Sequence, residues 1–295
     1  MELTEDATSL AVRHGDVELF RYVFEPPEPR VESPRPYLHP VRTLAGDVVS
    51  IYRPHDHAWH KGIAWSLPHV GPENFWGGPT FVRDKGYQQL PNNGAMRHRA
   101  FLDRAAGSFG ARFTHTLDWV TERGEVWFAE ERSIRVSLVD GGWLLDFATE
   151  LRNVRGAPVR IGSPTTEGRP NAGYGGLMWR GPRSFAGGRV VAPTVSGGDE
   201  LMGERAPWLA FHGRHDGHLR TSTLVFVDAP TNPGHPTMWF VRSEPFACVC
   251  PAPFFAAEVP VAPEETLSLR YGVVVADGEP DPAMLAAQVD LGPSR

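Results

Sequence analysis

Cysteine, lysine and long apolar runs are what this sequence has least of. It contains two cysteines and two lysines, and nowhere do eighteen apolar residues follow one another. A helix needs about that length to cross a bilayer, so we expect no spanning segment and no membrane partner. Acidic residues outnumber basic ones, 35 to 29, and the basic residues form no cluster. This charge pattern argues against nucleic acid as a partner.

The two cysteines, Cys248 and Cys250, bear on the compartment. They lie two apart in a segment that alternates like a strand, so both side chains point to one face, but the loop between them is too short for good disulfide geometry. We expect buried thiols in a reducing environment. The acidic start, Met1 to Asp6, precedes no apolar run and does not have the pattern of a secretory signal. These features predict a cytoplasmic protein.

Strand patterns dominate the chain. Alternating apolar and polar residues predict half-buried antiparallel strands at 111–120, 125–139, 143–154, 223–227, 238–242 and 266–276. Only 281–289 has a helical pattern, with Asp281 as N-cap and Pro282 in the first turn. No internal repeat is present, which counts against a propeller. We predict an all-β antiparallel sandwich or supersandwich with one short C-terminal helix, as a single domain over 1–295.

Two hairpins are predicted before these strands. The first spans 8–24 around a turn at 14–16, and the second joins 37–42 to 48–52 around a turn at 45–47. The second hairpin would place His39 on a strand and deliver the chain to 53–62.

Three histidines further along the chain are spaced by three, which on a helix would align them as a ligand set. They are His212, His215 and His218. The intervening glycines, Gly213 and Gly217, argue against a helix, so we expect a solvated turn there.

The candidate site begins at 53–62, Arg-Pro-His-Asp-His-Ala-Trp-His-Lys-Gly, which holds three of the twelve histidines. The run is too polar for a core strand, and Pro54 and Gly62 predict irregular backbone. Imidazole donates, accepts and titrates near neutral pH and is also a common metal ligand. A solvated turn is the alternative interpretation.

Polar and aromatic residues alternate on both sides of this loop and again in a glycine-rich run at 163–180. Aromatic faces cover the C–H side of a sugar ring, while charged and amide groups bind its hydroxyls. The mixture favours a sugar or another polyol as ligand. For 163–180 the alternative is a wide connection between two sheets.

Five motifs together resemble a bacterial family known as PmoA-like or "methane oxygenase PmoA": Arg-Pro-Tyr-Leu-His-Pro at 35–40, Asp-His-Ala-Trp-His-Lys-Gly at 56–62, Asn-Phe-Trp-Gly-Gly at 74–78, Gly-Tyr-Gly-Gly at 173–176 and Asn-Pro-Gly-His-Pro at 232–236. The resemblance covers about 30–278. It implies a galactose-mutarotase-like supersandwich whose concave face binds carbohydrate. The label itself transfers no activity.

In the wider mutarotase-like group a histidine and a carboxylate act as acid and base on a sugar, and by analogy the resemblance implies catalytic roles here. The candidates are His39, His57, His60 and His235 for the imidazole and Glu167 for the carboxylate. Polar and aromatic neighbours supply the candidate substrate-binding residues Arg35, Tyr37, Asp56, Trp59, Asn74, Trp76, Arg169, Tyr174, Trp179 and Arg242. The favoured hypothesis is an enzyme that anomerises, epimerises or eliminates a sugar-derived small molecule by proton transfer without a cofactor.

Two other functions stay open. A metal-dependent hydrolase or oxygenase would bind a divalent transition metal through His57 and His60, with His39, His235 or Glu167 completing the ligands. A non-catalytic sugar-binding module would need the aromatics but no titratable cluster. A homo-oligomer is compatible with either function.

Overall fold

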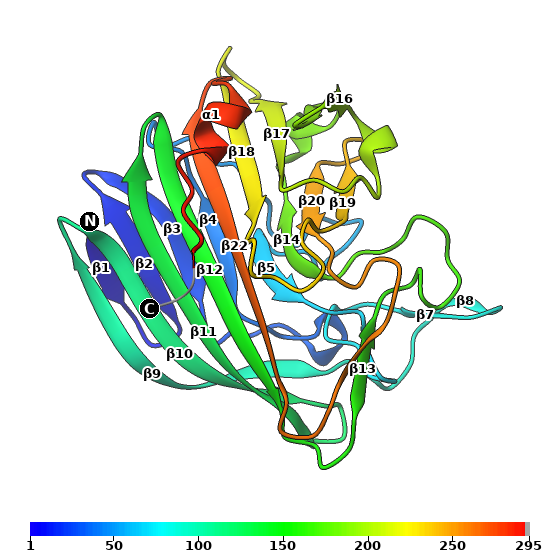
Figure 1. Cartoon of the computed structure of the whole chain (residues 1–295). Helices are drawn as coiled ribbons and strands as arrows, with labels where there is room; N and C mark the ends of the chain where they lie inside the picture. The colour runs from blue at the N-terminus through cyan, green and yellow to red at the C-terminus, as the bar shows by residue number, and fades with distance from the viewer. Residues whose placement is uncertain (293–295) are drawn as a thin grey trace.

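Strands and the turns between them build nearly all of the chain (Figure 1), as a computed structural model of residues 1–292 shows. In the long strands β10 (Gly110–Val120), β11 (Val126–Val139) and β12 (Gly142–Asn153) buried side chains alternate with more exposed ones over most of their length. On β12, Leu145 and Phe147 are buried while Asp146 between them is not. Neighbouring strands pair antiparallel throughout. The predicted all-β antiparallel class is confirmed.

Two large sheets pack face to face. The eight-stranded sheet runs in the order β1 (Glu2–Glu5), β2 (Ser9–His14), β3 (Val17–Val23), β4 (Tyr37–Val41), β5 (Ile63–Ser66), β14 (Gly176–Arg180), β20 (Cys248–Pro251), β19 (Trp239–Arg242). The nine-stranded sheet runs in the order β16 (Val195–Gly197), β15 (Arg189–Ala192), β17 (Trp208–Arg214), β18 (Thr221–Asp228), β22 (Thr266–Asp277), β12, β11 (Val126–Val139), β10 (Gly110–Val120), β9 (Ala95–Gly107).

Two small sheets lie beside the sandwich. They are β21 (Val259–Val261), β13 (Val159–Gly162) and β6 (His69–Val70), and the hairpin of β7 (Thr80–Val82) and β8 (Gly86–Gln88). The hairpin extends away from the large sheets on the side of β14, β19 and β20 (Figure 1). Single-turn 3-10 helices occupy Arg30–Glu32, Arg183–Phe185 and Asp199–Leu201.

Large aromatic side chains from both sheets fill the space between them. Trp65, Trp143, Trp179 and Trp239 are almost completely buried within one apolar cluster. Each such side chain removes a large apolar area from water, worth several kcal/mol on the scale of about 25 cal/mol per Å². The sandwich therefore gains its stability from contacts between segments far apart in sequence.

The C-terminal helix begins where the sequence predicted. α1 (Pro282–Ala286) has Pro282 at its start, and Asp281 accepts a hydrogen bond from the backbone N–H of Ala283 at 2.9 Å. The helix is shorter than the predicted 281–289. After Ala286 the chain continues as a tighter turn, in which the N–H of Val289 donates to the carbonyl of Ala286. Val289 packs against the sheet.

The first hairpin is confirmed as β2 and β3. Of the second, the first arm and the turn form and Arg42 pairs antiparallel with Val48, but the predicted strand at 48–52 is wrong. The segment 48–52 forms only isolated bridges. The hydroxyl of Ser50 accepts the backbone N–H of Val41, which takes the place of a ladder bond and ends the pairing. His39 does lie on a strand, β4.

The turn predicted at the spaced histidines is correct for His215 and His218, which follow β17. It is wrong for His212, which lies on β17, buried, with Nδ1 bonded to the Thr223 hydroxyl at 2.7 Å. Strand β17 continues through His212 and Gly213 to Arg214, further than the glycines indicated. Within residues 1–292, no helix is long and apolar enough to cross a membrane.

Candidate functional site

An aromatic cleft of about 580 Å³ lies on the outer face of the eight-stranded sheet. Alternation along the strands creates its floor. On β14, Leu177 and Trp179 face the core between the sheets, whereas Met178 faces the cleft. On β19 and β20, Phe240 and Cys248 point to the same side. Burial raises the pKa of the Cys248 thiol to about 12, so this group stays protonated near neutral pH.

Loops from distant parts of the sequence form the walls. They contribute His57, Trp59, His60, Trp76, Gly77, Pro79, Tyr87, Arg169, Tyr174, Arg242, Pro245 and Phe246. The histidine-rich loop and the glycine-rich run at 163–180 thus meet at one place. The structure brings together seven of the predicted site residues here: His57, His60, Trp59, Trp76, Arg169, Tyr174 and Arg242.

The ion pair between Arg180 and Asp56 contacts both cleft histidines. Nη2 of Arg180 donates to Oδ2 of Asp56 at 2.7 Å, and the same oxygen lies 2.8 Å from Nδ1 of His57. Nη1 of Arg180 lies 2.9 Å from Nδ1 of His60. The two imidazole rings stack with centroids 4.7 Å apart. One carboxylate and one guanidinium therefore orient both rings.

These partners impose opposite proton positions on the two rings. A guanidinium can only donate, so Nδ1 of His60 must accept, and the proton of the neutral ring sits on Nε2. An ionised carboxylate can only accept, so Nδ1 of His57 donates, and Nε2 of its neutral ring carries a lone pair. The cleft thus contains one hydrogen-bond donor and one potential base.

Burial and charge strengthen this assignment. Burial, followed by the neighbouring charges of His57 and Arg180, holds the pKa of His60 well below its usual value, so this ring stays neutral. Burial acts to raise the pKa of Asp56, but the hydrogen bonds from Arg180 and His57 outweigh it and hold the pKa far below the usual range. Asp56 therefore remains an anion beside His57.

Asn74 shapes the aromatic wall from behind it. Its Oδ1 accepts the backbone N–H groups of Trp76 and Gly77, and its Nδ2 donates to the carbonyl of Gly78. This turn presses the glycines against Trp59. A Cβ at Gly78 would lie 2.7 Å from the indole. Asn74 itself is buried and does not line the cleft.

Two further predicted residues support the cleft without lining it. Asp56 holds His57, as described above. Arg35 is buried and donates to the backbone carbonyl of Trp59 at 2.7 Å, which fixes the histidine-rich loop.

The other predicted residues lie elsewhere. His39 bonds the Ser50 hydroxyl, and burial lowers its pKa to about 4. Tyr37 is buried beside Tyr52. Trp179 is a core side chain whose indole N–H donates to the carbonyl of Val49.

Two of the proposed catalytic residues are also outside the cleft lining. His235 bonds Asp228 at 2.8 Å, beyond the end of β18. Glu167 lies on the same loop as Arg169 but is not among the lining residues. The structure therefore does not bring His39, His235 and Glu167 to the two cleft histidines.

Sequence reasoning missed Arg180 and several apolar lining residues, among them Tyr87, Phe240 and Phe246. Arg180 is 2% exposed at the end of an otherwise apolar, fully buried strand. A charge in such a strand requires a partner, and that is the signal that could have found it. The apolar residues carry no comparable signal, because core and cleft positions look alike in sequence.

The cleft fits a metal ion poorly. Across residues 1–292, no group of three or more His, Cys, Asp or Glu side chains could hold one. His57 and His60 supply two imidazoles, but Nε2 of His60 carries a proton in the neutral tautomer set by Arg180. A metal would bind there only if that proton were lost.

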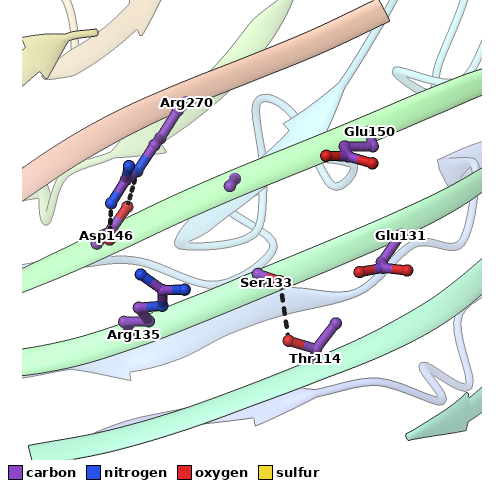
Figure 2. A pocket seen from close by; sticks show the side chains of 8 residues that line it. Thr114, Glu131, Ser133, Arg135, Asp146, Glu150 and Arg270 are labelled. Carbon is purple, nitrogen blue, oxygen red and sulfur yellow. Dashed lines mark hydrogen bonds and ion pairs between the residues drawn. The ribbon is translucent and has the colours of Figure 1, made fainter. Parts of the chain in front are cut away.

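A second depression, of about 410 Å³, lies on the outer face of the nine-stranded sheet. Figure 2 shows its side chains spread along successive strands, with Asp146 bonded to Arg270 and Thr114 to Ser133. Its lining contains no aromatic side chain and no histidine. Asp146 pairs with Arg270, whereas the ion pairs of residues 1–292 include none to Glu131, Glu150 or Arg135. Because this lining offers neither an aromatic surface nor an imidazole, we favour the aromatic cleft as the site.

Fold and site together define an antiparallel β-sandwich protein with an aromatic cleft and a paired histidine centre. Residues 9–290 match the model of a family described as "Family of unknown function (DUF6807)", and the chain belongs to that family. The description assigns no activity, and the resemblance to the PmoA-like family is not confirmed by it. No curated protein matches the chain.

Several solved structures are similar at low identity. An α-galactosidase from Lactobacillus brevis is 8% identical with a TM-score of 0.41, covering 94% of this chain and 39% of that one. A heparan sulfate lyase from Pedobacter heparinus is 9% identical with a TM-score of 0.33, covering 64% and 23%. A galactose mutarotase related enzyme from Lactobacillus acidophilus is 10% identical with a TM-score of 0.40, covering 90% and 97%.

This chain spans well under half the length of the first two proteins. The three solved structures show that carbohydrate-active and mutarotase-related proteins are among the structural neighbours of this fold. TM-scores this low carry no argument about the activity of this chain.

Proposed function

We propose that this chain is an enzyme that moves a proton on a sugar or a sugar-derived small molecule. His57 acts as the base and His60 as a neutral hydrogen-bond donor. The observation that carries the proposal is the pair of stacked imidazoles with opposite proton positions, held by Asp56 and Arg180. A binding module would have no use for such an arrangement.

The lining supports a sugar as the ligand. Trp59, Trp76 and Tyr174 offer aromatic surfaces, and the ring centroids of Trp76 and Tyr174 are 4.7 Å apart. Such faces cover the C–H side of a sugar ring, while the imidazoles and guanidinium groups bind its oxygens.

Removal of a proton from a carbon next to a carbonyl suits this geometry best. Nε2 of His57 takes the proton, and the electron pair moves to the carbonyl oxygen. The N–H of His60 donates to that oxygen as its negative charge develops. Return of the proton to the opposite face of the same carbon gives epimerisation. Delivery of the proton to the former carbonyl carbon, with a proton moved from the neighbouring hydroxyl to the enediolate oxygen, gives isomerisation. Expulsion of a leaving group from the next carbon, with a proton from His57, gives elimination.

Anomerisation is the weaker variant of the proposal. It requires an acid at the ring oxygen, and a neutral imidazole N–H gives up its proton reluctantly. In each of these reactions the carboxylate that serves the histidine is Asp56, in place of Glu167. The free buried thiols of Cys248 and Cys250 support a cytoplasmic location as part of this proposal.

The test is proton exchange in D2O. The protein is incubated with a panel of aldoses, ketoses and sugar acids, and loss of carbon-bound proton signals is followed by NMR. We expect exchange with at least one compound, a loss of at least a hundredfold in His57→Gln, and a loss of roughly tenfold to a thousandfold in His60→Gln. The exposed His14→Gln serves as control and retains the activity.

Two outcomes would favour the alternatives. Binding of a sugar by the wild type, with no exchange, isomer or unsaturated product from any compound, would indicate a binding module. About one equivalent of a transition metal by plasma mass spectrometry, lost in the His57→Ala/His60→Ala double variant, would indicate the metal-dependent enzyme.

A further inference from the structure

The cleft has an excess of positive charge. Two arginines, Arg169 and Arg242, line it, and the lining side chains within residues 1–292 include no Asp or Glu. Nη1 of Arg242 pairs with Asp199 at 2.8 Å, just behind the lining. The ion pairs of the described part of the chain include none to Arg169. The guanidinium of Arg169 is therefore the uncompensated cation of this cleft.

Aromatic contacts, not an acid, position Arg169. Its guanidinium lies over the ring of Tyr87, 4.9 Å from the centroid, and Nη1 donates to the Tyr87 hydroxyl. That hydroxyl bonds the hydroxyl of Tyr174 at 2.9 Å. Tyr174 is half-buried, and desolvation of its hydroxyl holds its pKa well above the usual value, so the phenol stays neutral. Nη2 and Nε of Arg169 are left to contact a ligand.

Arg169 stands apart from the histidine pair along one wall. His60 contacts Trp76, with ring centroids 5.7 Å apart, and Trp76 contacts Tyr174. The hydroxyl of Tyr174 bonds the hydroxyl of Tyr87, which accepts a hydrogen bond from Arg169. Three aromatic rings, those of Trp76, Tyr174 and Tyr87, therefore lie along the wall between the proton-transfer centre and the free cation. A ligand that reaches both must carry its anionic group several bonds from the reacting carbon.

We propose that the substrate is a sugar acid whose carboxylate binds Arg169 while its carbon skeleton lies on Trp76 and Tyr174 and its reacting end meets His57 and His60. This inference rests on the proposed function for the reacting end only. A planar guanidinium with one free edge matches a carboxylate, which accepts two parallel hydrogen bonds. A phosphate dianion would call for more donors than this single edge provides.

The experiment compares matched acids and neutral sugars by titration calorimetry at low ionic strength. Glucuronate is paired with glucose, galacturonate with galactose, and gluconate with glucitol, and glucose 6-phosphate is included. We expect at least one acid to bind the wild type roughly tenfold or more tightly than its neutral partner, because a charge-assisted hydrogen bond strengthens one complex only. Added salt should narrow the difference.

Arg169→Gln should remove this preference, and Arg169→Lys should restore part of it. The matched control is Arg160→Gln, which removes an exposed arginine on β13 that pairs with Glu258, and it should keep the preference. Equal affinities for every acid and its neutral partner would overturn the inference, as would a preference that survives in Arg169→Gln. Tighter binding of glucose 6-phosphate than of any carboxylate would overturn the choice of carboxylate.

Binding and turnover separate the two proposals. Acid-selective binding that depends on Arg169 but gives no proton exchange would support the anion site and contradict the enzyme. Exchange on a neutral sugar, with no preference for acids, would support the enzyme and contradict the anion site. Measuring affinities in His57→Gln keeps the binding test independent of catalysis.

Discussion

At the scale of single residues, two histidines three positions apart have acquired different chemistry. His57 and His60 share a loop and stack on each other, yet one faces a carboxylate and the other a guanidinium. The difference between donor and acceptor at Nδ1 fixes which ring can take a proton. Asp56 and Arg180 are therefore positioning residues: they act through the imidazoles.

Asp56→Asn tests this role. Oδ2 of Asp56 accepts from both Arg180 and His57. An amide NH2 in its place can donate to Nδ1 of His57 only at the expense of the bond from Arg180, and this donation would move the ring proton to Nε2 and remove the base. We expect proton exchange on the substrate to fall by a factor of about 10³ to 10⁴ with the fold retained, as when an orienting carboxylate becomes an amide in a serine protease. Nitrogen NMR of the imidazoles should show the change of tautomer.

Asp146→Asn is the matched control for that experiment. Asp146 and Arg270 both lie on the nine-stranded sheet, away from the cleft, and their side chains are 2.7 Å apart. This substitution should leave both the exchange rate and the His57 tautomer unchanged. An Asp56→Asn variant with a normal rate would refute the positioning role.

At the scale of elements, the cleft depends on how closely two loops approach. The turn at 74–78 packs its glycines against Trp59, and Gly78 has a φ of +68° with the Trp59 ring where a Cβ would stand. Only glycine combines that backbone conformation with that contact at low cost. The strands below supply a rigid floor, while the aromatic wall is set by this loop contact.

Gly78→Ala should therefore perturb the wall as well as the stability. A left-handed conformation costs alanine about 1 kcal/mol, and the contact with Trp59 adds to that. Gly234→Ala is the control, since Gly234 has a φ of +74° with nothing within 4 Å of its Cβ position. In urea unfolding we expect both variants to lose stability, Gly78→Ala by more. Only Gly78→Ala should alter the near-ultraviolet circular dichroism of the tryptophans, and equal losses with unchanged spectra would contradict this account.

At the scale of the whole molecule, burying histidines between and beside the sheets couples stability to pH. His69 is 8% exposed, and burial lowers its pKa to about 4. His60 and His115 are also buried with pKa values well below the usual one. Between the lowered pKa and 6.5 the unfolded chain binds protons that the folded chain does not. The stabilisation is therefore complete above pH 6.5 and is lost as the pH falls.

We expect the free energy of unfolding to decrease from pH 7 towards pH 4, with each such histidine contributing up to about 1.4 kcal/mol per pH unit. His69→Gln should reduce this slope by up to one proton, measured by urea unfolding at several pH values. His14→Gln, at an exposed position, should not change it. An unchanged slope in His69→Gln would show that this ring is already protonated in the folded state.

Local patterns in the sequence determined much of the fold. Two-residue alternation predicted the long strands β10, β11, β12 and β22 of the nine-stranded sheet and their antiparallel class, because the side chains of a strand must face either core or solvent. It did not predict β9, whose side chains are mostly exposed on both faces. The N-cap residue Asp281 with Pro282 located the helix start, and Pro54 and Gly62 marked the polar loop at 53–62. Alternation failed at 48–52, where a side chain of Ser50 replaced a backbone hydrogen bond.

Only the tertiary structure decided which residues meet in the cleft. His60 and Arg180 are 120 positions apart, and no local pattern relates them. For the same reason the sequence could not separate Trp76, which lines the cleft, from Trp179, which fills the core, although both follow glycine-rich or polar segments. The sequence by itself determined the strands and the presence of a histidine-rich loop. The order of the strands in the sheets determined the partners of each histidine. Periodicity in the sequence does not encode strand order.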